Sequence, residues 1–416
     1  MRVSVQRSPS ITAAPSSTRH WETGCGRLCL VRPGPLEVFT VALRLGLTSF
    51  GGPIAHLGYF RAEYVERRRW LTDSVFAELV ALGQFLPGPA SSQVGMAVGY
   101  TRAGWRGALA GWVGFTLPSA VIMAAFGALA AGGDIGDAVW LRALKLVAVA
   151  VVLDAVIGMA RRLAATRATA AIAVITGAAL LVLPESGLAQ VGCLILAALA
   201  GLLLFRSQPA RVAVELPLHV GRRAGVVALS VFVALLALLP IVAGLGVLAE
   251  LADAMYRSGA LVFGGGHVVL PLLEAETVPG LIEETTFLAG YGVAQALPGP
   301  LFTFGTYVGQ VAASLPGAVV ATIAVFLPGS LILFGVLPFW QRLRSDGRAQ
   351  AALTAVNAAV VGLLAAALID PIMTSSVDSV LDALFAAGLF VALYFGKAPP
   401  WLVVIIAALA SPVLGL

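Results

Sequence analysis

The stretch LVALGQFLPGPASSQVGMAVGY at residues 79–100 returns in altered form as GYGVAQALPGPLFTFGTYVGQ at residues 290–310. Both copies contain the core Gln-x-Leu-Pro-Gly-Pro in strongly apolar surroundings. Proline and glycine break a helix, and broken backbone at membrane depth is tolerated only against protein or beside a water-filled cavity. A pair of interrupted segments at matching places is typical of a transporter binding site. The sequence therefore predicts a duplicated membrane transporter.

The composition supports this prediction. Hydrophobic residues make up 59% and charged residues 11% of the 416 residues, and the mean hydropathy is +0.95. Soluble domains carry about 25% charged residues. The net charge of +5 comes from arginines in short loops between apolar runs, which is the orientation signal of a membrane protein rather than a nucleic-acid surface. We expect an all-α, multi-pass membrane protein that contacts lipid and binds no nucleic acid.

The repeat extends beyond the two Pro-Gly-Pro elements. Arg44 and the Phe-Gly-Gly at residues 50–52 match Arg257 and the Phe-Gly-Gly at residues 263–265, and a Leu-Pro pair follows in each half at residues 117–118 and 327–328. Few gaps and punctuating residues kept in order indicate homologous halves. We predict a disordered cytoplasmic tail, a first membrane half, a basic loop with a linker helix, and a second half. Their predicted bounds are residues 1–35, 36–205, 206–249 and 250–416.

The basic residues predict that the halves are inverted. Arginines lie at positions 61 and 67–69 in the first half, whereas the matching stretch of the second half carries glutamates at 274, 276, 283 and 284. Further on the bias reverses, with arginines at 342, 344 and 348 opposite a loop that has none. Because Lys and Arg stay cytoplasmic, matching loops lie on opposite sides of the membrane. An extra crossing near residues 224–247 would invert the second copy.

The same bias predicts re-entrant helical hairpins. Basic residues flank the segment 74–99 on both sides, so this segment enters and returns with its turn at residues 87–89. The segment 36–60, broken at residues 51–53, has the same flanks. Each arm of about 12–15 residues would reach roughly 20 Å, which is mid-membrane. The alternative is two full crossings with kinks. We expect about nine crossings and four such hairpins.

The turns are candidate anion sites. A helix that starts after Pro53 or Pro89 points its free N–H groups and positive dipole end at the turn, and such an end attracts anions. Arg44 and Arg257 each lie six residues before a Phe-Gly-Gly in apolar sequence, where an arginine costs at least about 2.5–3.5 kcal/mol and is a functional candidate. Its planar fork suits a tetrahedral oxyanion. The alternatives are packing kinks for the turns and arginines that extend to the membrane surface.

These motifs resemble the chromate ion transporter (CHR) family of the long, two-domain type. The resemblance rests on FGGPxxH at residues 50–56, ERRRWLT at 66–72, FGGGH at 263–267 and the two Pro-Gly-Pro cores, and it covers residues 36–416. It implies a multi-pass protein of the bacterial inner membrane that exports chromate and confers resistance. The substrate-binding candidates from the motifs and the turns together are Arg44, Gly51, Gly52, Pro53, His56, Gln84, Pro87, Gly88, Pro89, Ser91, Ser92, Arg257, Gly264, Gly265, His267, Gln295, Pro298, Gly299, Pro300 and Thr303.

Other functions remain open at this stage. A carrier of another oxyanion, such as sulfate or molybdate, would use the same helix ends because these anions share charge and shape with chromate. A membrane-embedded enzyme is a third class, but no phosphate-binding loop, metal-ligand cluster or catalytic triad spacing is present. We therefore expect a transporter rather than an enzyme, with no cofactor and no metal. The sequence leaves the oligomeric state open, and a homodimer is one arrangement that it allows.

Overall fold

The computed structural model describes residues 34–50, 52–132, 139–183, 187–205, 216, 218, 220–262 and 269–414. These residues form helices joined by short connections, and no strand occurs among them. The predicted all-α fold is confirmed.

The first half and the linker contain, in chain order, α1 (Pro35–Thr48), α2 (Gly52–Phe60), the π-helix η1 (Arg61–Arg67), α3 (Asp73–Phe85), α4 (Ala90–Ala131), α5 (Val139–Leu163), α6 (Arg167–Val182), α7 (Gly187–Leu204), α8 (Arg222–Val242) and the 3₁₀ turn η2 (Ala243–Leu245). The second half contains α9 (Val247–Leu261), α10 (Val269–Thr277), α11 (Glu284–Ala296), the 3₁₀ turn η4 (Leu301–Thr303), α12 (Phe304–Val336), the 3₁₀ turn η5 (Leu337–Phe339), α13 (Trp340–Ser345), α14 (Gly347–Ala367), the π-helix η6 (Leu368–Met373), α15 (Val380–Tyr394) and α16 (Pro400–Leu414).

Membrane-spanning helices are present in both halves. Within the described residues, five helical stretches are long and apolar enough to cross a membrane, and four shorter helices are also apolar. One of the five runs from Arg222 to Leu245, close to the linker crossing predicted from the sequence. None of its apolar window is buried inside the protein, so this helix lies at the periphery.

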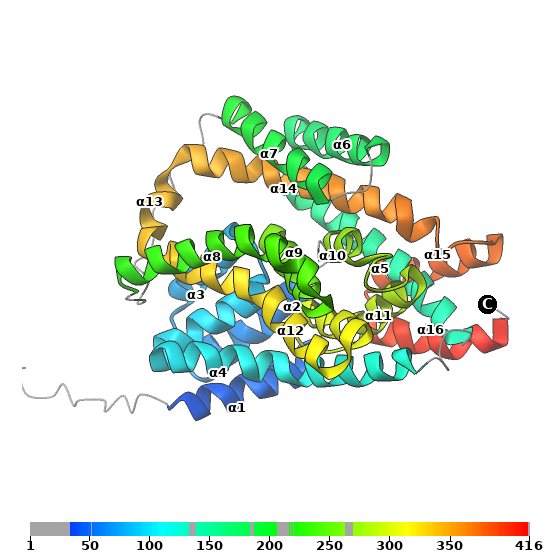
Figure 1. Cartoon of the computed structure of the whole chain (residues 1–416), viewed down its shortest axis with the longest axis horizontal. Coiled ribbons are helices and arrows are strands. Elements are labelled where there is room, and N and C mark those ends of the chain that lie inside the picture. Colours follow the sequence, from blue (N-terminus) through cyan, green and yellow to red (C-terminus); the bar gives the residue numbers. More distant parts are fainter. Residues whose placement is uncertain are drawn as a thin grey trace, which may run out of the picture.

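The helices pack in matching pairs around a shared centre (Figure 1). α1 lies along α4 in the first half, and α9 lies along α12 in the second. α4 and α12 contact each other and join the halves, while α14 packs on α6 and α7, and α15 and α16 pack on α5. Glycines allow the α1–α4 and α9–α12 contacts, because a Cβ on Gly46 would lie 2.6 Å from the Phe115 carbonyl and one on Gly259 would lie 2.2 Å from the Val325 carbonyl.

The chain turns back at the first Pro-Gly-Pro, as a hairpin requires. α3 ends at Phe85 and α4 begins at Ala90, and a Cβ on Gly83 would lie 3.2 Å from the Ala90 carbonyl across the turn. α3 has 13 residues, or about 20 Å at 1.5 Å per residue, which is too short to cross a membrane. The broken hairpin predicted for this segment is confirmed, and a mere kink in a spanning helix is wrong.

A second reversal divides α4, and it recurs in α12. The backbone leaves helical geometry at Ala103 and Gly104, and again at the matching Ala313 and Ser314. Gly99 then faces Gly107 so closely that a Cβ on Gly99 would lie 2.2 Å from the Gly107 carbonyl. The same break at the same place in each half confirms the repeat. With the reversed charge bias of their loops, the two halves are an inverted repeat.

We expect the Gly99→Ala variant to fold poorly, because the new Cβ would meet backbone that cannot move without opening the hairpin. Overpacking of this kind costs about 1–3 kcal/mol. Thermal unfolding of the detergent-purified protein, followed by size-exclusion chromatography, should show a lower midpoint and a lower folded yield. Gly192→Ala on α7 is the control, because a Cβ there meets nothing within 4 Å. An unchanged midpoint for Gly99→Ala would contradict the tight hairpin.

Candidate functional site

The two Pro-Gly-Pro turns are bonded crosswise between the halves. The Gly88 N–H donates to the Val262 carbonyl at 2.7 Å, and the Gly299 N–H donates to the Ser49 carbonyl at 2.9 Å. Ser49 directly precedes the first Phe-Gly-Gly, and Val262 directly precedes the second. Each turn therefore contacts the helix end before the break of the opposite half. The predicted convergence of all four turns around one anion site stays a prediction, because Gly51 and residues 263–268 lie outside the described residues.

Both central glycines have backbone conformations that suit glycine. Gly88 has φ +112° and Gly299 has φ +97°. A Cβ on Gly88 would lie 2.8 Å from the Gly329 Cα, and one on Gly299 would lie 2.8 Å from the Ser119 hydroxyl oxygen. Ser119 and Gly329 occupy matching positions, each directly after the Leu-Pro pair of its half. The contacts are thus related by the same pseudo-symmetry as the hydrogen bonds.

The N-terminus of α4 is buried and uncapped. Its N-cap is Pro89, which provides no side-chain hydrogen bond. Among the described residues, the N–H groups of Ala90, Ser91 and Ser92 have no hydrogen-bond acceptor. Ser91 and Ser92 are buried, and the Ser92 hydroxyl has no partner there either. A helix end buried without such partners is rare, and free N–H groups with a positive dipole end form a ready anion site.

Gln93 holds the first turn in place; the sequence indicated it as a hydrogen-bond donor after Pro89 but did not predict these partners. Its Nε2 donates to the Pro87 carbonyl at 2.8 Å and to the Gly329 carbonyl at 3.0 Å, which ties the turn to α12 of the other half. Gln93 is fully buried, and the available sequence signal was a glutamine directly after two serines in an apolar stretch. Gln84 and Gln295, which match in the repeat, differ in the structure, because Gln84 is exposed and Gln295 is buried.

The second Pro-Gly-Pro turn is built differently. The 3₁₀ turn η4 follows Pro300 before α12 begins, so the helix starts later than in the first half. The Thr303 hydroxyl donates to the Pro300 carbonyl at 2.9 Å. Thr306 shares a hydrogen bond with Thr322. The Thr303 hydroxyl thus closes the turn on itself, whereas the Ser92 hydroxyl of the first half is unpaired among the described residues.

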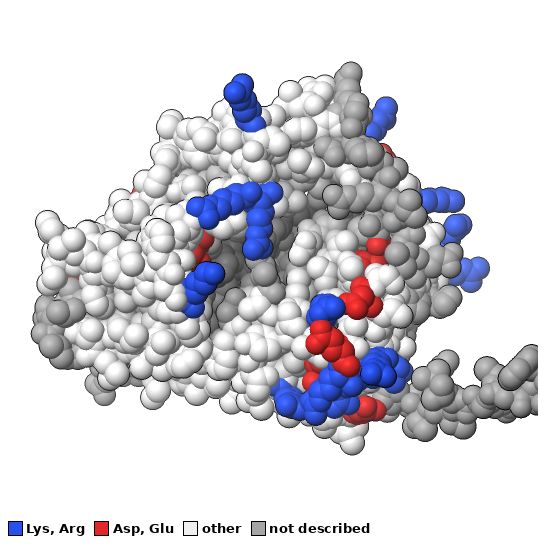
Figure 2. All heavy atoms as spheres, turned by 180° about the vertical axis from the view of Figure 1, so that it is seen from behind, with Lys and Arg blue, Asp and Glu red and all other residues white. Residues whose placement is uncertain are grey.

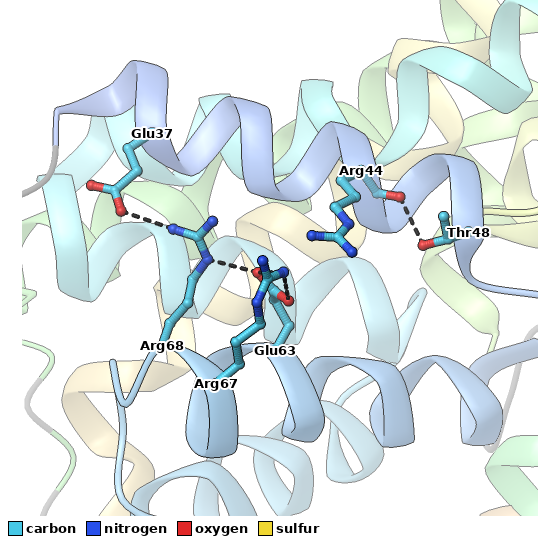
Figure 3. Close-up of polar contacts among 6 residues, drawn as sticks. All are labelled: Glu37, Arg44, Thr48, Glu63, Arg67 and Arg68. Carbon is cyan, nitrogen blue, oxygen red and sulfur yellow. Dashed lines mark hydrogen bonds and ion pairs between the residues drawn. The ribbon is translucent and has the colours of Figure 1, made fainter.

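Arg44 lies on the exposed face of α1 and makes no ion pair with any described residue. It precedes Ser49 by five residues, or about 7.5 Å along the helix. In Figure 3 its side chain points from α1 toward the side on which Glu63 and Arg67 lie, and no interaction of its guanidinium with them is drawn. An unpaired guanidinium is thus present one and a half turns from the crossed contacts.

Arg257, the repeat partner of Arg44, is held by two carboxylates. Its Nη2 lies 2.7 Å from Asp253 Oδ2 and 2.7 Å from Glu276 Oε2. The acidic side chains are 4% and 11% exposed. This arginine therefore lies in a locally negative group, and an anion would have to displace a carboxylate to bind it. The spacing of Asp253 and Arg257, one helical turn apart, was the available sequence signal.

Charged side chains gather where α1, η1 and α3 meet. Arg68 bonds Glu63 and Glu37, and Arg67 bonds Glu63 (Figure 3). Arg61 bonds Glu66 and Asp73. Burial raises the pKa of the Glu63 carboxyl, but hydrogen bonds from Arg68 and Arg67 outweigh burial and hold the pKa below its ordinary value. Because the folded-state pKa is lowered, these ion pairs stabilise the fold at neutral pH and weaken only in acid.

Much of the surface seen in Figure 2 carries no charge. Basic and acidic side chains gather at one edge of this face, and further basic side chains stand around a hollow near its middle. Single basic side chains also stand at the top and right-hand margins of this view. A largely uncharged exterior is the pattern of a protein surrounded by lipid.

The remaining sequence candidates are placed only in part. His56 is buried on α2, with its ring edge-on to Phe115 at a centroid distance of 5.5 Å. Gly52 begins α2 with φ +79°, and Pro53 lies in its first turn. Gly51, Gly264, Gly265 and His267 lie outside the described residues. Their predicted roles stay predictions.

An all-α fold of two inverted halves with broken hairpins, and turns bonded crosswise near an uncapped helix end, defines a multi-pass membrane transporter. A family model described as chromate transporter matches residues 36–205 and 249–411. The chain belongs to the chromate transporter family.

Curated relatives match most of the chain. A chromate transport protein of Pseudomonas aeruginosa is 30% identical over 373 residues, which is 85% of this chain and 86% of the relative. A probable chromate transport protein of Synechococcus elongatus is 29% identical over 79% of this chain and 82% of the relative. A chromate transport protein of Cupriavidus metallidurans is 29% identical over 81% and 82%. No solved structure gives a significant match.

Proposed function

We propose that this chain is a secondary carrier that exports chromate across the bacterial inner membrane. The observation that carries the proposal is the buried, uncapped N-terminus of α4 in a chain that belongs to the chromate transporter family. The N–H groups of Ser91 and Ser92 and the Ser92 hydroxyl would bind the chromate oxygens. The crossed Gly88 and Gly299 contacts would hold this helix end against the second half.

Arg44 would supply the positive charge of the site. A chromate dianion in a low-dielectric interior needs a cation or several donors, and the guanidinium of Arg44 is unpaired among the described residues. We assign Arg257 a different role, because Asp253 and Glu276 already neutralise it. The candidates of the second half, Gln295 and His267 among them, would line the path on that side.

The membrane potential is sufficient to drive export. A dianion that leaves a cell that is negative inside gains about 2.3 kcal/mol per charge for each 100 mV. No nucleotide-binding motif occurs in the sequence, so an ion gradient or the potential would be the energy source. A homodimer stays a prediction.

Inside-out vesicles test the proposed substrate and direction. We expect vesicles that contain the protein to accumulate labelled chromate when their interior is made positive, at least tenfold above vesicles without it. A tenfold excess of sulfate should reduce the uptake much less than the same excess of unlabelled chromate. Uptake equal to that of empty vesicles would contradict chromate transport. Preferred uptake of labelled sulfate would assign the site to the other oxyanion.

A further inference from the structure

Arg257 on α9 holds two carboxylates with one nitrogen atom. Its Nη2 lies 2.7 Å from Asp253 Oδ2 on the same helix and 2.7 Å from Glu276 Oε2 on α10. One guanidinium charge thus faces two carboxylate charges. The Asp253 side chain is 4% exposed and the Glu276 side chain is 11% exposed. The Arg257 side chain is 35% exposed, so the two carboxylates are the buried part of the group. When both are ionised, they keep a surplus negative charge, which is costly in a low-dielectric interior.

One carboxylate oxygen of this group has no partner within the described part of the chain. Asp253 Oδ1 is buried and makes no hydrogen bond with any described residue, and the same is true of Arg257 Nε. A buried, ionised carboxylate oxygen without a donor is destabilised. A proton on either carboxyl group cancels the surplus charge and leaves a one-to-one ion pair with Arg257. A proton on Asp253 also removes the charge from the carboxyl group whose Oδ1 has no partner.

The acids are absent from the matching positions of the first half. Arg44 matches Arg257, but Thr40 stands where Asp253 would be and Val65 stands where Glu276 would be. The Thr40 hydroxyl instead donates to the Glu37 carbonyl at 3.0 Å. α1 packs in the first half without carboxylates at these positions, so the packing of α9 in the second half does not require them either. The repeat has kept the arginine in both halves and has added two carboxylates in one of them.

We infer that Asp253, Arg257 and Glu276 form a proton-binding site that couples proton movement to anion transport. The inference rests on the proposed transport function. The ligand is H⁺: it adds to a carboxylate oxygen of Asp253 or Glu276, and no other bond forms or breaks. Loss of the proton restores the surplus negative charge on α9, which ends at the Val262 carbonyl that Gly88 contacts. The charge state of this group thus acts on a helix that ends at a turn of the anion site.

Other charged or titratable groups lie on the helices packed against α9 and α10. These are Glu250, Tyr256, Glu274, Arg222, Arg223, Cys193, Glu284, Tyr291, Tyr307 and Arg348. Neither α7 nor α12 carries an Asp, Glu, Lys or Arg. Glu274 has an interaction of its own. Asp253 and Glu276 are the two carboxylates that share the single guanidinium of Arg257.

Liposomes with a pH dye inside test the coupling. With the full-length protein and a potential clamped by potassium and valinomycin, a chromate gradient should move protons, and chromate flux should vary with pH. In Asp253→Asn combined with Glu276→Gln, chromate flux under the imposed potential should persist, but its pH dependence should vanish and protons moved per chromate should fall at least tenfold. Glu66→Gln, an exposed carboxylate that bonds Arg61, is the control. An unchanged proton-to-chromate ratio in the double variant would overturn the inference.

Infrared difference spectroscopy of the purified protein separates this inference from the proposed function. Lowering the pH protonates other carboxylates as well, so the spectrum of the double variant is subtracted from that of the wild type. The difference should contain the C=O band of a protonated carboxyl group, and the same subtraction from Glu66→Gln should retain it. A band of equal intensity in the wild type and the double variant would overturn the proton site. The wild type could also show the band, and the double variant lack it, while the wild type moves no chromate. That result would support the proton site and contradict the proposed chromate transport.

Discussion

The Gly88→Ala variant is expected to lose nearly all chromate transport. The new Cβ would lie 2.8 Å from the Gly329 Cα, and φ +112° is strained for alanine. The backbone strain destabilises the folded protein by about 1–2 kcal/mol, and the overlap destabilises it by about 1–3 kcal/mol. The substitution would push the turn away from α12 and open the Gly88 bond to the Val262 carbonyl. Uptake per folded molecule in proteoliposomes is the measurement.

Gly104→Ala is the matched control for this variant. Gly104 also has a positive φ, +60°, but a Cβ there meets nothing within 4 Å. Its repeat partner is Ser314 with φ +54°, so a side chain is already accepted at the matching turn. Gly104→Ala should therefore transport almost normally. A Gly88→Ala protein that is scarce but fully active per molecule would show that the turn is only a packing kink.

Arg44 should be the side chain whose charge transport needs most. Arg44→Gln removes the charge and the planar fork, and a hydrogen bond to a charged group contributes about 1.5–3 kcal/mol, or roughly 10- to 100-fold in affinity. We expect Arg44→Gln to lower the initial rate of chromate uptake at least tenfold at equal expression. Arg44→Lys keeps the charge but loses the fork, so it should raise the half-saturating chromate concentration and retain part of the transport.

An exposed arginine that the site does not use is the comparison. Arg106 lies on the exposed surface of α4 just after the hairpin turn, and Arg106→Gln should leave the uptake rate within twofold of the wild type. Wild-type uptake per molecule in Arg44→Gln would remove Arg44 from the site. The α4 helix end would then have to bind the dianion without a cation.

Local features of the fold were predictable from the sequence. The turns at the Pro-Gly-Pro elements, the break before Pro53 and the linker helix follow from proline, glycine and apolar length, all of which act on neighbouring residues. The repeat was also visible, because Arg44 and Arg257 keep their spacing to Phe-Gly-Gly. Inversion followed from where the arginines lie.

Contacts between the halves could not be predicted in the same way. Gly88 bonds Val262, and Gly299 bonds Ser49, across distances in sequence at which no local pattern specifies a partner. The repeat made both Arg44 and Arg257 candidates, but the environment of each arginine is set by residues that the halves do not share. Glu276 reaches Arg257 only because α10 folds back on α9.

The crosswise bonds of the two turns also constrain how the protein is made. The first Pro-Gly-Pro turn leaves the ribosome long before Val262, so its N–H at Gly88 has no carbonyl to bond until the linker helix α8 has crossed and α9 has followed. A chain cut between its halves would leave both turns incomplete. Two separate halves would restore them only by inserting in opposite orientations and meeting in the bilayer, so correct reading of the arginine bias by the insertion machinery comes before assembly of the site.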